Sequence, residues 1–428
     1  MRAILIFIMI VQAILGHSQI MSGPMRGYAT MTEVGLWIQL ESEGNIEIHY
    51  WFENKDDHMV STADEVHPKE GVYKFRIGNL EPGTEYNYEI VLNENSIELD
   101  GLTFKTQPLW QYREEPPALK IALGSCNYVN EEAYDRPGKV YGNDHGIFNS
   151  IAETSPDLML WLGDNIYLRE VDFSSWSGYV HRHTHTRSIP ELEKLLQSTN
   201  NYAIWDDHDF GPNDADGSWI HKDWAQDAFE MFWMNPSTGL PGENGITTAF
   251  RYGDIDFFLL DNRYFRTSRD ANHITPQVLG KTQIEWLIEA MKYGRAPFKL
   301  VAVGGQVVND AAVYENHAQF ADERIYLLDR IAEEKIEGVI FLTGDRHHTE
   351  LSMIEHQGVK IYDLTVSPLT AGTHNALDEP NSNRVEGTHV AEHNFGIIEI
   401  TGTRLAREMN ISIFDKSGEE IWSKAIER

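Results

Sequence analysis

Hydrophobic and polar residues alternate in short, turn-bounded segments from about residue 24 to residue 107. The segments that carry this pattern are GLWIQL, NIEIHYWF, VYKFRIGNL, YNYEIVL and LTFKTQ. A period of two places successive side chains on opposite faces of a strand, and turns at this spacing are typical of sandwiches. The pattern therefore predicts a β-sandwich, and the absence of an ionisable cluster assigns it no chemistry.

The pattern changes after a proline-rich, charged junction at residues 107–120. Beyond it, short apolar runs alternate with helical segments, and most runs end in Gly, Asp or Asn. Fully apolar runs suit strands that are covered on both faces, so they predict an α/β domain. The runs are LKIALG, DLMLWLG, YAIW, IDFFLLD, FKLVAVG, GVIFLTG, IYDLTV and FGIIEI.

Two of the intervening segments, 222–233 and 321–334, show helical periodicity. Each places apolar side chains on one face, which is typical of core packing. The predicted core positions are Trp224, Ala228, Met231 and Phe232 in the first segment, and Ile325, Leu328 and Ile331 in the second.

Residues 1–19 begin with one arginine, continue as a short apolar stretch and reach small residues at Gly16 and Ser18. This is the layout of a signal peptide, and the stretch is short for a membrane span. An uncleaved anchor is the alternative. No later run is long and apolar enough to cross a membrane, so we expect a secreted or periplasmic protein without a transmembrane segment.

The length, charge and cysteine content of the chain indicate which binding partners and which bonds are expected. A chain of 428 residues is long enough for two domains, and its formal net charge of −31 disfavours a nucleic-acid-binding surface. The one cysteine, Cys126, cannot form an intramolecular disulfide. A lone thiol in an exported protein is expected to be buried or bound to metal.

Four segments offer potential metal ligands directly after a predicted strand. A two-metal hydrolase needs this arrangement, because several strand ends must bring anionic and imidazole ligands to one point while leaving room for water and substrate. A single Gly-Asp pair is most often a turn. The four in this order are Gly124–Asn127, Gly163–Tyr167, Trp205–Asp209 and Gly344–His348.

This ordered set resembles the alkaline phosphatase D (PhoD-like) branch of the calcineurin-like metallophosphoesterases. The run Leu80–Tyr86 also resembles the tyrosine corner of fibronectin type III domains, and Asn213 and Arg263 belong to further matching segments. The resemblance implies an α/β four-layer metallophosphoesterase sandwich with an N-terminal fibronectin type III-like or Ig-like β-sandwich. The expected domains are a signal peptide at 1–19, the β-sandwich at 20–107, a linker at 108–120 and the catalytic domain at 121–428.

The resemblance also implies roles for single residues. Asp164 takes the place of the carboxylate that bridges two metal ions, and Asp207 the place of a metal-binding asparagine. His208 takes the place of the catalytic histidine. Asp345 and His347 stand where the family's Gly-His-x-His motif carries two histidines.

The sequence departs from the general metallophosphoesterase pattern in two places. Cys126 replaces the first Asp-x-His motif. The family's lone histidine ligand has no convincing counterpart in this sequence. Gln306 or Asn309 could replace it, so one ligand of the second metal is not assigned.

The ligand chemistry indicates two kinds of metal. Thiolate and phenolate groups suit a redox-capable transition metal, whereas carboxylate oxygens suit calcium. Tyr167 follows Asp164 by three residues, as in purple acid phosphatases, and the resemblance implies iron with calcium. The expected ligands are Cys126, Asp164, Tyr167 and His347 for Fe3+, and Asp164, Asp207, Asp345 and, as an extra ligand, Asn213 for Ca2+.

These features predict an exported alkaline phosphatase or phosphodiesterase that hydrolyses phosphate monoesters or diesters with a metal-activated hydroxide. His208 is expected to protonate the leaving alkoxide or to stabilise its charge. Arg263 either clamps a phosphate oxygen or forms a salt bridge with Asp261 or a neighbour. The alternative from another class is an inactive, calcium-stabilised surface or binding protein on the same fold.

Three further expectations concern the histidine-rich segment, the substrate and the oligomeric state. The alternating histidines His181, His183 and His185 are predicted to lie in a polar lid or surface loop rather than in a dedicated metal site. The substrate is expected to be a small-molecule or lipid phosphate ester. The protein is expected to act as a monomer, without stable nucleic-acid binding.

Overall fold

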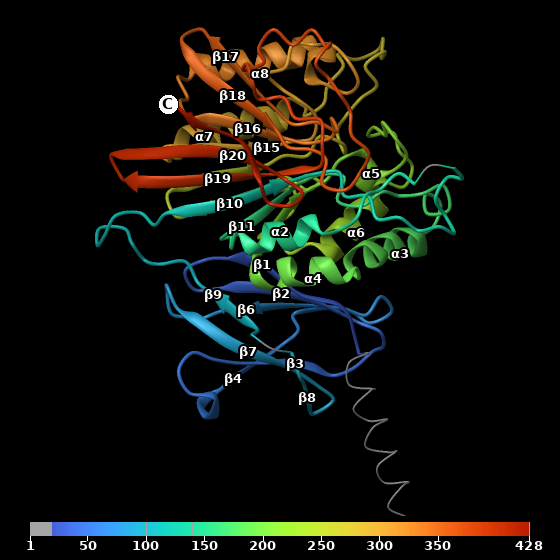
Figure 1. Ribbon diagram of the computed structural model, residues 1–428, viewed down its shortest axis with the longest axis vertical. Helices are drawn as coiled ribbons and strands as arrows, with labels where there is room; N and C mark the ends of the chain where they lie inside the picture. Colours follow the sequence, from blue (N-terminus) through green and yellow to red (C-terminus); the bar gives the residue numbers. More distant parts are fainter. Residues whose placement is uncertain (1–18, 100, 139, 428) are drawn as a thin grey trace, which may run out of the picture.

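The computed structural model describes residues 19–99, 101–138 and 140–427 (Figure 1). The signal peptide predicted for residues 1–19 falls almost entirely outside the described residues. Among the helices that the structure describes, none combines the length and apolar composition needed to cross a bilayer.

Residues 20–105 form two antiparallel sheets that enclose one apolar core, which includes Leu36, Phe75 and Ile90. Buried and more exposed positions alternate along β3 and β7, as the period of two predicts. The first sheet has the order β1 (Ile20–Ala29), β2 (Val34–Leu40), β6 (Val72–Ile77), β5 (Glu65–His67). The second has the order β4 (Met59–Thr62), β3 (Ile46–Trp51), β7 (Glu85–Leu92), β8 (Asn95–Ile97), and β9 (Thr103–Lys105) pairs with β7.

A hydrogen bond closes the corner before β7. The hydroxyl of Tyr86 accepts the backbone N–H of Glu81 at 2.9 Å. This contact ties the turn to the strand within the Leu80–Tyr86 run, as the tyrosine-corner resemblance predicts.

The N-terminal sheets pack closely on the rest of the chain. Trp37 Nε1 on β2 donates to the backbone carbonyl of Met231 at 2.9 Å. The backbone N–H of Tyr28 donates to the backbone carbonyl of Met234 at 3.1 Å. A Cβ atom at Gly27 would lie 2.4 Å from the Cβ of Met234, so this approach requires glycine. The two parts therefore share a tight interface.

The larger part contains two six-stranded sheets. Parallel pairing joins β10, β11 and β12 in one sheet and β14, β15, β16 and β18 in the other, so the carboxyl ends of these strands meet at one edge of each sheet. The first order is β12 (Asn200–Ile204), β11 (Leu158–Leu162), β10 (Leu119–Gly124), β19 (Asn394–Thr403), β20 (Ala406–Asp415), β21 (Glu420–Ile426). The second is β13 (Thr248–Tyr252), β14 (Ile255–Leu259), β15 (Lys299–Ala302), β16 (Val339–Thr343), β18 (Val359–Thr365), β17 (Glu350–His356).

The two sheets pack face to face between helices. Phe257 and Leu259 on β14 belong to the core shared with the first sheet, whereas Phe258 lies in a separate core with α7 and α8. Figure 1 shows α2 and α4 on the side of the first sheet that faces the N-terminal sheets. The helices are α2 (Ile147–Glu153), α3 (Trp176–Arg187), α4 (Pro190–Ser198), α5 (Asp207–Phe210), α6 (Lys222–Phe232), α7 (Lys281–Tyr293) and α8 (Ala321–Glu333), with short 3-10 helices at Lys55–Asp57 and His317–Gln319.

The two predicted helices are confirmed as α6 and α8, with one wrong core position. Ala228, Met231 and Phe232 are buried on α6, and Leu328 and Ile331 are buried on α8. Ile325, however, is 50% exposed, and Leu327 is buried instead. The apolar face of α8 is rotated by part of a turn from the predicted one.

The prediction of a loop for the histidine segment is wrong, because residues 176–187 form α3. On a helix, positions two apart point in nearly opposite directions. His183 is buried and stacks on Phe232 with ring centroids 4.7 Å apart, while His181 is paired with Glu131 on the outer side. The alternation therefore separates the histidines into a core position and more exposed ones.

Candidate metal centre and active site

Ligand-bearing residues from both large sheets converge at the carboxyl ends of their parallel strands. Cys126 follows β10, Asp164 follows β11 and Asp207 follows β12, all in the first sheet. Asp345 and His347 follow β16 of the second sheet. The site therefore lies where the edges of the two sheets meet, as expected for α/β sheets.

Four groups of side chains have potential ligand atoms within 4.8 Å of one another. Asp164 belongs to two of these groups and Asp207 to three, so the groups form a continuous cluster. The groups are Cys126–Asp164–His347, Asp164–Asp207–His208, Asp206–Asp207–Asp345 and Asp207–Asp214–Glu315.

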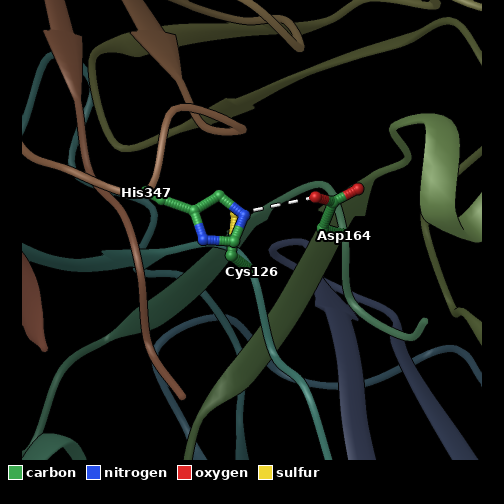
Figure 2. Close-up of side chains that lie close together, drawn as sticks. All are labelled: Cys126, Asp164 and His347. Atoms are coloured by element: carbon green, nitrogen blue, oxygen red, sulfur yellow. Dashed lines mark hydrogen bonds between the residues drawn. The ribbon is translucent and has the colours of Figure 1, made fainter. Parts of the chain in front are cut away.

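The first group combines sulfur, oxygen and nitrogen donors (Figure 2). Cys126 Sγ lies 3.6 Å from Asp164 Oδ2, the contact that the dashed line marks. The Tyr167 hydroxyl donates to the same oxygen at 3.1 Å and lies 3.3 Å from His347 Nε2. All four residues predicted to hold iron are therefore neighbours.

Burial opposes ionisation of this group while no cation is near. It raises the pKa of the Cys126 thiol to about 12, with a further contribution from the charge of Asp345. Burial also raises the pKa of Asp164 well above its usual value, and the charge of Asp207 adds to the effect. A bound cation would reverse these shifts, because it stabilises thiolate and carboxylate forms.

The neighbouring carboxylates are left partly unsatisfied. Asp206 Oδ2 and Asp207 Oδ1 are buried and have no hydrogen-bond partner among the described residues. The pKa of Asp345 is raised to about 8, by burial first and then by the charges of Asp206 and Asp207. Each of these two carboxylates therefore has one buried oxygen that can still accept a ligand contact, and carboxylate oxygens fit a hard cation such as Ca2+.

Arg263 compensates part of this negative charge. Its side chain is 1% exposed and forms ion pairs with Asp206 and with Glu315, whose other oxygen pairs with Arg266 at 2.8 Å. Asp261, the partner considered from the sequence, instead accepts the backbone N–H of Arg263 at 2.8 Å. The predicted salt bridge of Arg263 therefore forms with Asp206 and Glu315 rather than with Asp261.

His208 lies on the short helix α5 beside both carboxylates that connect the groups. Its backbone N–H donates to Asp164 Oδ1 at 3.3 Å, and its ring lies tilted against Tyr167 with centroids 4.2 Å apart. Burial lowers the pKa of His208. The side chain can therefore act as a hydrogen-bond donor to a substrate or as a metal ligand, and its position allows both.

Three of the predicted residues have other contacts. Asn213 is exposed and donates to Asp214 Oδ1 at 2.8 Å, and it is Asp214 that enters a ligand group. The side-chain oxygens of Gln306 and Asn309 accept hydrogen bonds from Arg346 and from the backbone of Ala311, respectively. Both oxygens therefore already contact protein donors.

The sequence analysis missed three members of the cluster. Asp206 stands inside a recognised motif and could have been assigned from its position before Asp207. Asp214 and Glu315 lie in loops without a motif, so only the folded chain brings them to the site.

Several ligand candidates adopt a left-handed backbone conformation. The φ angles of Cys126, Asp164, Asp345 and His347 are 59°, 52°, 66° and 56°. Residues with a side chain adopt this conformation at a cost of about 1–3 kcal/mol, and such residues concentrate at functional sites. The conformation aims their side chains at the common point.

Comparison with known proteins identifies the family. The family model described as PhoD-like phosphatase matches residues 125–410. A solved structure of PhoD is similar, with a TM-score of 0.71 and 17% identity over 96% of this chain and 92% of that chain. The purple acid phosphatase PPD1 from yellow lupin (Lupinus luteus) seeds has a TM-score of 0.65 and 13% identity over 95% of this chain and 74% of that chain.

A search of curated proteins finds no match. The family model nevertheless covers more than half of the chain, including every ligand group described above. The two solved structures support the same mixed α/β architecture. The chain belongs to the PhoD-like phosphatase family.

Proposed function

We propose that this protein is an exported, metal-dependent phosphoesterase that hydrolyses phosphate monoesters or diesters. The observation that carries the proposal is the convergence of Asp164 and Asp207 with the other ligand groups at the strand ends. Two buried carboxylate oxygens there have no hydrogen-bond partner within the part of the chain that the structure describes. Two adjacent cation sites that share a carboxylate are the arrangement that phosphate-ester hydrolysis uses.

For the metals, we propose Fe3+ at Cys126, Asp164, Tyr167 and His347, and Ca2+ at Asp164, Asp207 and Asp345. The mixed sulfur, phenol and imidazole donors of the first set support a transition metal, and the oxygen donors of the second support calcium. We add Asp206 to the second set because it shares a group with Asp207 and Asp345, and we propose Asp214 rather than Asn213 as the extra ligand.

When bound, the cations would lower the pKa of a water molecule and neutralise charge on the phosphate. Side chains of the protein would orient the metal ligands and assist the leaving group. Arg263 holds Asp206 in a fixed orientation, which makes it a positioning residue. His208, beside Asp164, donates a hydrogen bond or a proton to the leaving oxygen.

Hydrolysis of para-nitrophenyl phosphate and of its bis-ester tests the proposal. The enzyme should hydrolyse at least one of them, and the ratio of the two rates would assign the monoester or diester preference. The second candidate, an inactive calcium-stabilised binding protein, predicts calcium binding with no release of para-nitrophenol from either ester.

The metal assignment predicts a coloured protein. Thiolate and phenolate ligands on ferric iron should give a visible charge-transfer band, and elemental analysis should find iron and calcium together. Because Cys126 is the chain's one cysteine, Cys126→Ser should remove the thiolate contribution and leave that of Tyr167. A colourless, fully active protein that contains only zinc would refute the assignment.

For the chain's organisation, we propose a signal peptide at 1–19, a fibronectin type III-like domain at 20–107, a linker at 108–120 and a catalytic domain at 121–428, acting as a monomer. The separate core of residues 20–105 supports the division. N-terminal sequencing of the secreted protein should begin between about Gln19 and Met21. A membrane-bound product that retains Met1 would contradict export.

A further inference from the structure

A cavity of about 590 Å³ opens beside the ligand cluster, between two loops. One loop contributes Val313 and Tyr314, and the other contributes His374, Asp378 and Glu379. Tyr314 is 61% exposed, so its aromatic ring is available at the cavity. The lining therefore combines an aromatic surface with carboxylates.

The cavity lies close to the metal centre. The backbone N–H of His374 donates to the backbone carbonyl of His347 at 2.8 Å. Tyr314 directly precedes Glu315, whose carboxylate belongs to a ligand group. Beneath Tyr314 lies the guanidinium of Arg346, 4.8 Å from the ring centroid. The cavity therefore lies next to residues that carry or contact the ligand groups.

One carboxylate of the lining is already neutralised. Both oxygens of Glu379 accept Arg346 Nη2 at 2.8 Å, and Oε1 also lies 3.0 Å from His374 Nε2. The other guanidinium terminus of Arg346 donates to Gln306 and Asn316. Arg346 is thus fully engaged and does not offer a free cationic site to an anion in the cavity.

Asp378 differs from Glu379. It is exposed at the cavity, and its carboxylate has no hydrogen bond or ion pair among the described residues. An unpaired carboxylate and an exposed aromatic ring that line one cavity attract organic cations, because the positive charge interacts with the carboxylate and with the ring face. An anionic group would be repelled at the same place.

We propose that this cavity binds a positively charged ammonium group on the organic part of the phosphate ester. The inference deepens the proposed function and rests on it, since the metal centre would hold the phosphate while Tyr314 and Asp378 contact the cation. It assigns the substrate class as phosphate esters of amino alcohols, including quaternary ones.

Two esters of matched shape test this assignment. Para-nitrophenyl phosphorylcholine and para-nitrophenyl 3,3-dimethylbutyl phosphate differ in the organic group only by replacement of the charged nitrogen with carbon. The kcat/KM for the choline ester should be about tenfold higher, the size of a cation–aromatic contact reinforced by a carboxylate. Because the comparison is a ratio, it does not depend on the amount of folded enzyme.

Single substitutions test whether the preference for the choline ester depends on the cavity. Asp378→Asn and Tyr314→Leu should each lower the ratio towards 1. Glu386→Gln removes an exposed carboxylate from the same segment but outside the cavity, and should leave the ratio unchanged. A ratio near 1 in the unaltered enzyme, or an unchanged ratio in both cavity variants, would overturn the inference.

Calorimetric binding of choline and of 3,3-dimethylbutanol to the metal-loaded protein separates the two proposals. Choline should bind more tightly than the neutral alcohol, and equal binding would reject the cavity assignment. If neither ester were hydrolysed, the proposed function would fail, and this binding comparison would still decide what the cavity prefers.

Discussion

Asp164→Ala should lose both metal ions and about 10³-fold or more of the activity on every ester. Asp164 connects the Cys126 group with the Asp207 group, so its removal takes a ligand from each. Bound cations supply several kcal/mol of transition-state stabilisation, and each 1.4 kcal/mol corresponds to a factor of about ten. Metal content and kcat/KM, measured on the same sample, check the result.

Asp209→Asn provides a matched control. Asp209 is buried and accepts the backbone N–H of Asn165, next to Asp164, yet it belongs to none of the four ligand groups. Its other oxygen accepts the backbone N–H of Asp206 at 2.9 Å. An amide at this position can keep one of the two hydrogen bonds and removes no ligand atom, so the variant should keep iron and calcium. Loss of both metals in Asp209→Asn but not in Asp164→Ala would contradict the assignment of Asp164 as the shared ligand.

His208→Ala should separate acid catalysis from metal binding. A group that assists the leaving oxygen matters most for alkyl phosphates and much less for para-nitrophenyl esters, whose leaving group departs without a proton. We expect a loss of roughly 10²- to 10⁴-fold on an alkyl phosphate, a markedly smaller loss on the aryl ester, and unchanged metal content.

The opposite pattern would identify His208 as a ligand. Its ring is close enough to Asp164 and Asp207 to share a cation with them. Equal slowing of both esters together with the loss of one metal ion would therefore show that the leaving-group role is wrong. His347→Ala is the reference for ligand loss, because His347 lies in the Cys126 group.

Much of the fold could be predicted because the central strands are covered on both faces. The fully buried strands β11, β12, β14 and β16 appear in the sequence as unbroken apolar runs. Strands with a mixed pattern, such as β21, have no comparable signal. The histidine segment could not be predicted as a helix for a similar reason. It has no apolar stripe, and the burial of its residues depends on the packing of α3 on α6.

The candidate site could be predicted where potential ligands directly follow a strand. Cys126, Asp164, Asp207 and Asp345 were found in this way, because parallel strands bring their ends together. Glu315 could not be found, since it lies in a loop and its relation to Arg263 exists only in the folded chain. Position in sequence therefore predicted residues that lie together in the candidate site, but not the charged side chains that contact them.

Metal dependence of hydrolysis tests the central claim most directly. Iron and calcium would be removed from the purified protein by reduction and chelation, and each would then be returned separately and together. We expect activity on para-nitrophenyl phosphate or its bis-ester to disappear with the metals and to return fully only when both are restored. Full activity in protein shown by elemental analysis to contain no metal would contradict the account.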